Sequence, residues 1–240
     1  MEQHPYNARE PIPDGTNLVI VGTAPPPRFS NPTLGGMRGM DFDFFYGSED
    51  NHAWEFLKNI AKRRKNIKLF EDGFSSEQCC DAARSFLRDN RIWMRDVLNS
   101  YRREEGKEHL AEDSYIIPIQ LSSFRELLQT ESISSLAFTS EQAADWTFSA
   151  LAQERLLERP EHLTSAFKEW RTIGQGLKVE DIAQRKFKEP FVVCRIGGRD
   201  FCLHILPTPT SRSRIKGLTL KLKESIYEHV LFDRLSVNEF

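Results

Sequence analysis

The residues best suited to chemistry lie in two loops and in one aromatic segment between them. The loops are Gly22-Thr23-Ala24-Pro25-Pro26 and Pro207-Thr208-Pro209-Thr210-Ser211, and both are stiffened by proline and rich in small polar groups. Between them, Phe42, Phe44 and Phe45 gather in a stretch rich in Gly and Asp rather than in a periodic element. Such a cluster suggests a surface on which a planar ligand stacks. On the residues alone, however, aromatic side chains of this kind are more often part of a core.

Both loops are expected to follow strands. Residues 17–22 contain a continuous apolar, mostly β-branched run that ends at a glycine, which is typical of a parallel strand covered on both faces. Residues 92–98 and 133–138 predict two further strands. Thr139 and Ser140 follow the last of these, and their hydroxyls can cap a helix beginning at Glu141. This segment therefore predicts a strand–helix unit.

The other helices are marked by apolar spacing and by capping residues. Ser75 with Gln78, and Ser123 with Glu126, have the spacing of a capping box, and each pair predicts the start of a helix. The helices predicted in this way cover residues 51–65, 76–89, 123–129 and 218–231. Arg102 and Arg103 are expected in a polar loop. Residues 151–190 are polar and helix-prone, and we expect a solvated helical insertion there.

The C-terminal third adds a β-hairpin. Residues 191–196 and 201–206 are strand-like and flank Gly197-Gly198, which can supply the positive φ angles of a tight turn. Together these elements predict one domain over residues 1–240. Its expected fold is a three-layer α/β/α sandwich around a central, mostly parallel sheet of about four strands, with the added hairpin near the C-terminus. In such sheets ligands bind beyond the carboxyl ends of the strands.

Composition excludes several classes of protein. The chain has 240 residues, a formal net charge of −2 and no apolar stretch near the length of a membrane span. Its first residues contain no apolar segment typical of a secretory signal, so a cytoplasmic protein is expected. The 4 cysteines have no metal-ligand spacing and are expected to be reduced packing thiols. We therefore expect no metal or cofactor, no membrane partner and a monomer.

The order of several motifs resembles the uracil-DNA glycosylase superfamily, most closely its hypoxanthine-DNA glycosylase and mismatch-specific branches. The resemblance covers most of the chain and is missing over the 151–190 insertion. The matching segments are the Gly-x-x-Pro loop at Gly22–Pro25, the aromatic pair Phe45-Tyr46 before Asn51-His52-Ala53-Trp54, the segment 93–98 with its Asp-Val-Leu, Arg103 and Gly106, Asp113-Ser114-Tyr115-Ile116, Phe138-Thr139-Ser140 and the proline-rich loop after residue 206.

This resemblance implies an enzyme that hydrolyses the N-glycosidic bond of a flipped deaminated base in DNA, hypoxanthine or uracil, and leaves an abasic site. It implies that Asn51 is the leading catalytic contact. Asp96, at or near the carboxyl end of a predicted strand, is a second candidate, for reading the base or orienting water. The implied substrate-binding residues are Gly22, Thr23, Ala24, Pro25, Phe44, Phe45, Tyr46, Asn99, Thr139 and Ser140. The implied DNA-binding residues are Pro207, Thr208, Thr210, Ser211, Arg212 and Arg214, and the partner is DNA with a damaged or mismatched base.

Each assignment has a plainer alternative. Asn51 can be only the cap of the helix that follows it, and Asp96 can be a structural carboxylate. Ala24 stands where many members of the superfamily carry a residue that activates water, and Leu206 where several carry a histidine. These departures keep open a second function, a non-catalytic nucleic-acid or nucleotide-binding protein on the same fold. The slight net negative charge also opposes DNA binding, although cations without acids between Thr208 and Lys223 can supply phosphate contacts locally.

Overall fold

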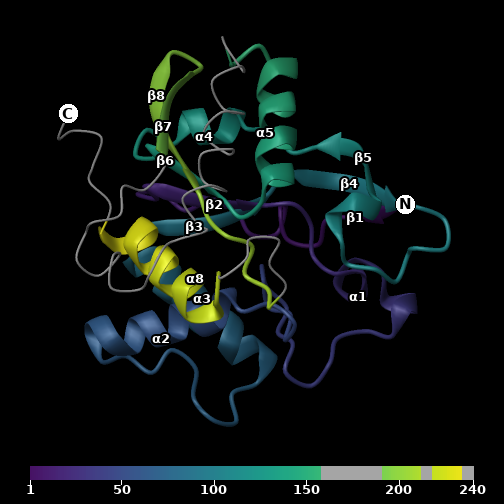
Figure 1. Cartoon of the computed structure of the whole chain (residues 1–240), viewed down its shortest axis with the longest axis vertical. Coiled ribbons are helices and arrows are strands. Elements are labelled where there is room, and N and C mark those ends of the chain that lie inside the picture. The colour runs from purple at the N-terminus through teal and green to yellow at the C-terminus, as the bar shows by residue number, and fades with distance from the viewer. Residues whose placement is uncertain (158–190, 212–217, 234–240) are drawn as a thin grey trace.

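A five-stranded, mostly parallel sheet organises the chain. The computed structural model describes residues 1–157, 191–211 and 218–233. The strands are ordered β3 (Ile92–Asp96), β2 (Leu18–Gly22), β6 (Ser135–Phe138), β8 (Arg199–Ile205) and β7 (Phe191–Ile196). The first four are parallel and β7 is antiparallel to β8. The predicted central sheet and the added hairpin are thus confirmed (Figure 1).

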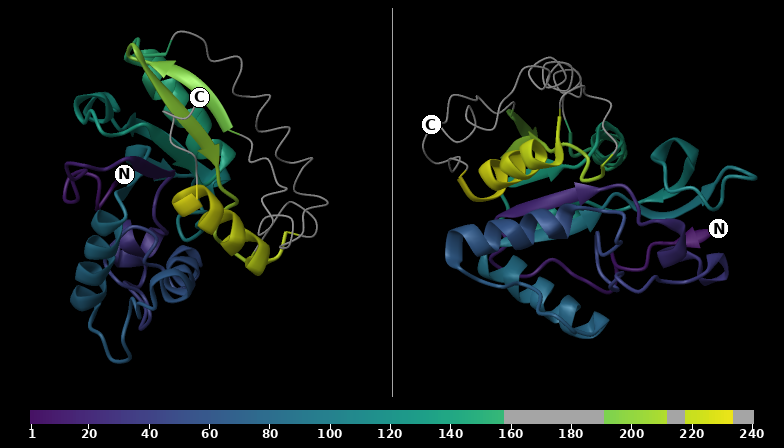
Figure 2. Two further views of the ribbon diagram at one scale, coloured as in Figure 1. Left: turned by 90° about the vertical axis from the view of Figure 1, so that its left-hand side faces the viewer. Right: turned by 60° about the horizontal axis from the view of Figure 1, so that its bottom comes forward.

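Helices flank this sheet. They are α1 (Pro27–Ser30), α2 (Ala53–Lys65), α3 (Ser76–Asp89), α4 (Arg125–Gln129), α5 (Glu141–Gln153) and α8 (Leu220–Glu228), with 3-10 turns at Pro32–Leu34 and Asp113–Tyr115 and a π-helical turn at His229–Asp233. The connections from β2 to β3 and from β6 to β8 step in opposite directions along the sheet. Because such crossovers are right-handed, α3 and α5 belong on opposite faces. Figure 2 shows the sheet between these two helices.

A second, smaller sheet continues beyond β3. It consists of β1 (Glu2–Gln3), β4 (Leu98–Arg103) and β5 (Ile116–Leu121), all antiparallel. The strand expected over 92–98 is confirmed as β3 over Ile92–Asp96, but the polar loop expected after it was wrong, because the chain turns at Val97 and continues as β4. Arg102 and Arg103 lie in that strand, and Arg103 is buried while Arg102 is exposed. Pairing with distant segments makes this strand, so its own polar sequence does not reveal it.

The capping residues behave differently at the two expected boxes. The Ser75 hydroxyl accepts a hydrogen bond from the backbone N–H of Gln78, and the Gln78 side chain accepts one from the Ser75 N–H, which confirms that box. The second box was wrong, because α4 begins after Phe124 with no side-chain cap. Ser123 there accepts only a 3.3 Å bond from the Arg125 N–H.

The remaining predicted elements lie close to their expected positions. Ser140 accepts a bond from the Ala143 N–H and caps α5, as expected. Gly197 and Gly198 have φ of +56° and +85°, which confirms the tight turn between β7 and β8. Of the expected 151–190 insertion, residues 158–190 lie outside the described part of the chain. Within the described residues, no helix is long and apolar enough to cross a membrane.

The two serines provide a test of capping. Ser75→Ala should lower the free energy of unfolding by about 1 kcal/mol, because the Gln78 N–H in the first turn of α3 loses its side-chain acceptor. Ser123→Ala is the matched control and should change it by less than about 0.5 kcal/mol. Urea unfolding followed by circular dichroism measures both. Equal losses in the two variants would contradict the structural difference between the two helix starts.

Candidate functional site at the carboxyl ends of the parallel strands

The carboxyl ends of the four parallel strands meet at one edge of the sheet. Gly22 of β2 lies opposite Asp96 of β3, and Phe138 of β6 lies opposite Ile205 of β8. The loops that follow these strands are therefore neighbours, as the sequence predicted. Thr23 to Pro25, Asp96, Thr139 with Ser140, and the loop from Pro207 all begin at this edge.

Side chains from other segments lie very close to Gly22. A Cβ atom on Gly22 would lie 2.1 Å from the Tyr46 hydroxyl oxygen and 2.4 Å from Asp96 Oδ1, so no side chain fits there. The Tyr46 hydroxyl is 3.1 Å from Thr139 Oγ1. Tyr46 itself has a φ of +56°, a backbone conformation that a non-glycine residue rarely adopts. Three loops are thus joined over one glycine, and the backbone holds Tyr46 there in a strained state.

Asp96 is held by histidine through one carboxylate oxygen. Asp96 is 5 % exposed, and its Oδ2 lies 2.9 Å from Nε2 of His4. Nδ1 of His4 accepts hydrogen bonds from the backbone N–H groups of Tyr6 and Asn7, at 3.2 and 3.1 Å. Nε2 therefore carries the proton and donates to Asp96. Among the described residues Oδ1 has no hydrogen-bond partner, so a buried acceptor faces Gly22 and Tyr46.

A second carboxylate, which the sequence did not single out, comes to the same place. Asp113 lies in the 3-10 turn before β5, and its Oδ1 accepts a 2.7 Å hydrogen bond from the Thr23 hydroxyl. Burial raises the pKa of Asp113 to about 6, and the charge of Asp96 acts in the same direction. The hydroxyls of Thr23 and Ser140 and the charge of Arg103 oppose this rise. The Asp-Ser-x-Ile resemblance marked this position, but no signal in the sequence indicated its role.

Tyr46 contributes a neutral hydroxyl. Burial raises the pKa of its phenol well above the usual value, and the nearby charge of Asp96 raises it further. The phenol therefore keeps its proton at neutral pH and can donate it in a hydrogen bond.

Arg103 clamps the loop that follows β2. Its side chain is fully buried and its Nε lies 3.3 Å from a carboxylate oxygen of Glu2. One Nη donates to the Pro25 carbonyl at 3.1 Å and the other to the Leu110 carbonyl at 2.9 Å. Through Pro25, β4 of the small sheet thus fixes the Gly-x-x-Pro loop of the large one. Ala24 in that loop offers no acid or amide side chain.

Asn51 lies beside the loop that follows β8. Its Oδ1 accepts a 2.9 Å hydrogen bond from the N–H of Ala53, the first residue of α2, although the cap position of that helix is His52, whose side chain makes no cap bond. The next residue, His52, donates its backbone N–H to the Pro209 carbonyl at 2.7 Å. The start of α2 and the Pro207–Thr210 loop are therefore adjacent.

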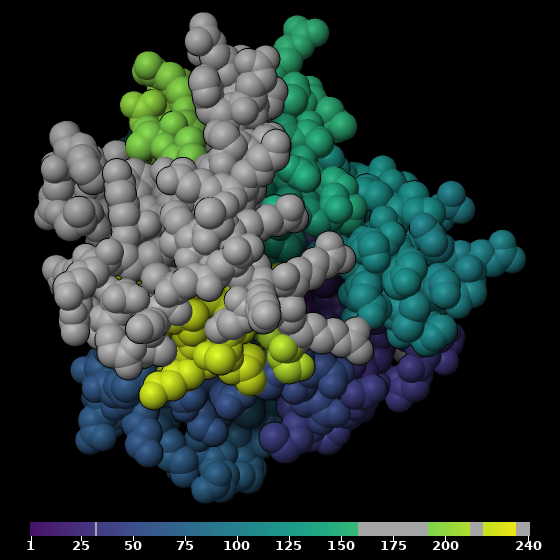
Figure 3. All heavy atoms as spheres, viewed as in Figure 1, coloured from purple at the N-terminus to yellow at the C-terminus, as the bar shows by residue number. Residues whose placement is uncertain are grey.

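Side chains of helix α8 hold the same loop, which follows β8. The Lys223 ammonium donates to the carbonyls of Thr208 and Thr210 at 2.9 and 2.7 Å, and the Tyr227 hydroxyl donates to the carbonyl of Pro207 at 3.1 Å. Lys223 is 1 % exposed, so it is not one of the surface cations expected for phosphate contacts. Figure 3 shows α8 at the surface beside residues of α2. Ser211 is exposed, whereas Arg212 and Arg214 lie outside the described residues.

The expected stacking platform of Phe44 and Phe45 was wrong. The two residues are 0 and 1 % exposed, because the aromatic segment folds inward onto the sheet. Phe44 packs against Trp54 and Trp93, with ring centroids 6.0 and 6.1 Å apart. These phenylalanines belong to the core, and Tyr46 alone of the expected aromatic set reaches the strand ends.

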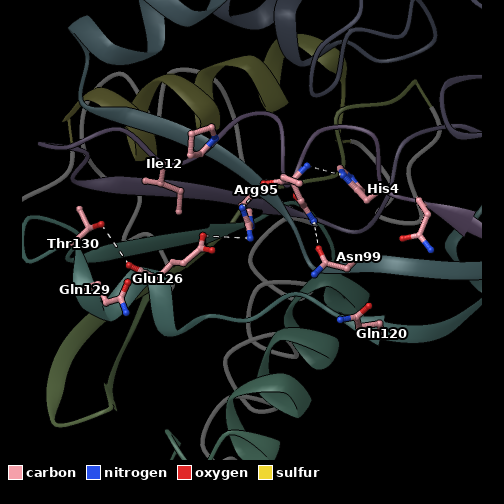
Figure 4. Close-up of a pocket in the computed structure, with 12 residues that line it drawn as sticks. His4, Ile12, Arg95, Asn99, Gln120, Glu126, Gln129 and Thr130 are labelled. Carbon is pink, nitrogen blue, oxygen red and sulfur yellow. Dashed lines mark hydrogen bonds and ion pairs between the residues drawn. The ribbon is translucent and has the colours of Figure 1, made fainter.

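Asn99 lies to one side of the polar cluster at the strand ends. Its Oδ1 accepts hydrogen bonds from Asn7 and Ser122, at 3.1 and 2.9 Å. Asn99 also lines a cavity of about 540 Å³ between the N-terminal segment, β3 and α4. Figure 4 shows that His4 and Arg95 border the same cavity. The other predicted site residues do not line it, so the cavity adjoins the strand-end cluster through His4 rather than containing it.

The cluster offers hydrogen-bonding and acid–base chemistry. Among the described residues no group of three or more His, Cys, Asp or Glu side chains is placed to hold a metal ion. Two buried carboxylates, a neutral phenol and the hydroxyls of Thr23 and Thr139 remain. Such a set can bind a polar planar ligand and accept a proton from water.

Comparison with known proteins adds little to this picture. No family model matches the chain. No curated protein matches it either. A solved structure that matches is the solution NMR structure of "a putative Uracil DNA glycosylase from Methanosarcina acetivorans", with a TM-score of 0.47 and 15% identity over 92% of this chain and 91% of that chain. A TM-score below 0.5 does not establish a common fold.

The close contact at Gly22 can be tested by adding a methyl group. Gly22→Ala should lower the free energy of unfolding by about 1–3 kcal/mol, because the new Cβ overlaps the Tyr46 hydroxyl and Asp96 Oδ1. Gly39→Ala is the control, since that position is exposed and has no atom within 4 Å of an added Cβ. Urea unfolding measures both. A neutral Gly22→Ala would mean that the strand ends are not packed in this way.

Proposed function

We propose that the protein is a DNA glycosylase that hydrolyses the N-glycosidic bond of a flipped deaminated base, hypoxanthine or uracil, and leaves an abasic site. One observation carries the proposal. Segments that resemble separate glycosylase motifs converge on one strand edge, through Thr23 with Asp113, Tyr46 with Thr139, and Asp96 against Gly22. The residues in these contacts are 90 or more positions apart in the first two pairs, so their convergence is a property of the fold.

The chemistry of base release matches the polar groups at this edge. The bond breaks through a sugar with oxocarbenium character, so the enzyme must hold the extruded base and stabilise charge. Asp96 Oδ1, which has no hydrogen-bond partner among the described residues, can face the cationic sugar or orient water. The neutral Tyr46 hydroxyl and the backbone N–H groups of Thr23 and Ala24 can donate to carbonyl oxygens of the base. Asn51 remains the proposed catalytic contact by resemblance.

The stacking role passes from the two phenylalanines to Tyr46. Its ring is the aromatic group of the segment that lies at the strand ends, where its hydroxyl contacts Thr139. Stacking of a base on an aromatic ring contributes roughly 1–3 kcal/mol in single-strand binding proteins. A flipped base entering this edge must pack against the Tyr46 ring or displace it.

The DNA backbone is proposed to bind along the loop after β8. The exposed Ser211 with Arg212 and Arg214 would contact phosphates, while Lys223 and Tyr227 hold the carbonyls of the loop from inside. Such contacts position the duplex without reading its sequence. In this proposal the enzyme acts as a cytoplasmic monomer without a metal or cofactor.

A non-catalytic nucleic-acid or nucleotide-binding protein is the second candidate. It is favoured by Ala24, which supplies no acid, and by the capping bond that already occupies the Asn51 oxygen. The two functions differ in base release, which only the enzyme performs. DNA binding without base release from any lesion would favour the second candidate.

Two substitutions at Asn51 separate its hydrogen bond to the helix start from its proposed chemistry. Asn51→Asp keeps a side-chain oxygen for the Ala53 N–H but removes the amide donor, whereas Asn51→Ala removes both. If the amide contacts the base or water, both variants should release base about 10²–10³-fold more slowly. The assay uses labelled oligonucleotides with uracil, hypoxanthine, xanthine or mismatched thymine, single- and double-stranded, and alkaline cleavage of abasic sites.

Stability and DNA binding provide the controls for that experiment. Asn51→Asp should unfold within about 0.5 kcal/mol of the parent and bind DNA with the parent's affinity. Undiminished base release by Asn51→Asp would leave Asn51 as a helix cap only.

A further prediction distinguishes the ring of Tyr46 from its hydroxyl. Tyr46→Phe keeps the ring and should bind lesion-containing DNA within about threefold of the parent, whereas Tyr46→Ala should lose about 5- to 150-fold, the equivalent of one stacking contact. Fluorescence anisotropy measures both affinities, with a DNA duplex that contains the lesion and has no abasic site. If the two variants lose equal affinity, the hydroxyl rather than the ring makes the contact.

A further inference from the structure

We propose that Asp113 is the general base that activates water, and that it supplies from outside the Gly-x-x-Pro loop the acid that Ala24 lacks. This inference rests on the proposed glycosylase function and assigns a role within it. Asp113 reaches the loop from the 3-10 turn before β5, which belongs to the small antiparallel sheet. The carboxylate is thus contributed by a different element from the one in which superfamily members often carry it.

The geometry places this carboxylate at the loop. The Thr23 hydroxyl, one residue before Ala24, donates to Asp113 Oδ1 at 2.7 Å. Arg103 donates to the Pro25 carbonyl, one residue after Ala24, and its charge also favours the ionised form of Asp113. Ala24 is therefore flanked on both sides by residues that are tied to Asp113 or to its counter-charge.

The surroundings of Asp113 suit a base that works near neutral pH. Its facing groups are Asp96 from β3, Arg103 from β4, Tyr46 from the loop before α2, and the hydroxyls of Thr23 and Ser140. The carboxylate of Glu2 offsets part of the charge of Arg103. Burial is the largest cause of the rise in the pKa of Asp113 to about 6. The carboxyl group is therefore mostly ionised at pH 7 yet more basic than that of an ordinary aspartate.

Asp96 is less suited to the same task. Its Oδ2 is occupied by the His4 N–H, and the residue is 5 % exposed at the end of β3. Asp113 is less buried than Asp96. The division that follows is a carboxylate held by His4 at Asp96 and a proton acceptor at Asp113.

The step balances without any further reagent. A water molecule forms a bond from its oxygen to C1′ of the sugar, and Asp113 takes one of its protons. The bond between C1′ and the base nitrogen breaks, and its electron pair leaves with the base. The proton on Asp113 then passes to solvent or to the departing base, which restores the carboxylate. The products are the free base and an abasic sugar with a hydroxyl at C1′.

The test is the pH dependence of single-turnover base release from the lesion duplex that the parent cleaves. The parent rate should fall tenfold per pH unit well below the Asp113 pKa of about 6 and level off above it. Asp113→Asn should be at least about 10²-fold slower at pH 8 and should lack this acidic limb. Glu112→Gln removes an exposed charge one residue away and should keep the parent's rate and profile.

The pH dependence of stability distinguishes a catalytic base from a structural carboxylate at Asp113. Because the folded pKa of Asp113 lies above its ordinary value of 3.8, ionisation disfavours folding, so the parent loses stability as pH rises from about 4 through about 6. Asp113→Asn removes that loss and should be at least as stable as the parent at pH 8. A variant that is less stable at every pH would assign Asp113 a structural role and overturn the inference.

Thr23→Val gives a second, independent variant. It removes the hydroxyl that lowers the pKa of Asp113, so the midpoint of the acidic limb should move to higher pH. If the parent cleaves a lesion and neither variant alters rate or profile, the inference alone fails. If the parent cleaves no lesion at any pH, the proposed function fails and the inference fails with it.

Discussion

The close approach of three segments over Gly22 is the constraint on which the rest of the site depends. The Tyr46 hydroxyl and Asp96 Oδ1 both lie where a side chain at this position would begin. Only glycine allows the end of β2 to pass beneath them. Once that approach is fixed, Thr139 falls within 3.1 Å of Tyr46, and the loop after Gly22 is directed toward Asp113. The polar cluster therefore depends on a glycine, which has no side chain, at the end of a buried strand.

Burying these groups carries a cost that packing alone does not require. Tyr46 holds a left-handed backbone conformation, Asp96 keeps an unpartnered buried oxygen within the described structure, and burial shifts the pKa of Asp113 upward. Each feature destabilises the folded state, and a core built for stability would replace them with apolar side chains. Their occurrence together at the strand ends, where α/β sheets bind ligands, is what favours a functional site over a structural network.

The sequence predicted well what depends on local patterns. The all-apolar run of β2 predicted a strand buried on both faces, the Ser75 box predicted α3, and the paired glycines predicted the hairpin turn. It failed where distant segments decide the outcome. The polar strand β4 forms because it pairs with β1 and β5, and Phe44 turns inward because Trp93 lies behind it. No pattern along the chain carries that information.

For the same reason, the sequence predicted only part of the candidate site. Asp96 and Thr23 could be placed because they adjoin predicted strand ends, and Tyr46 because it belongs to the aromatic pair of the resemblance. His4 and Asp113 reach the cluster from segments with no strand or helix signal of their own. Their partners Asp96 and Thr23 lie 92 and 90 residues away in the chain. The absence of an acid at Ala24 therefore does not decide whether this edge is catalytic. What matters for chemistry is the carboxylate that reaches the loop in space, and here a different element provides it.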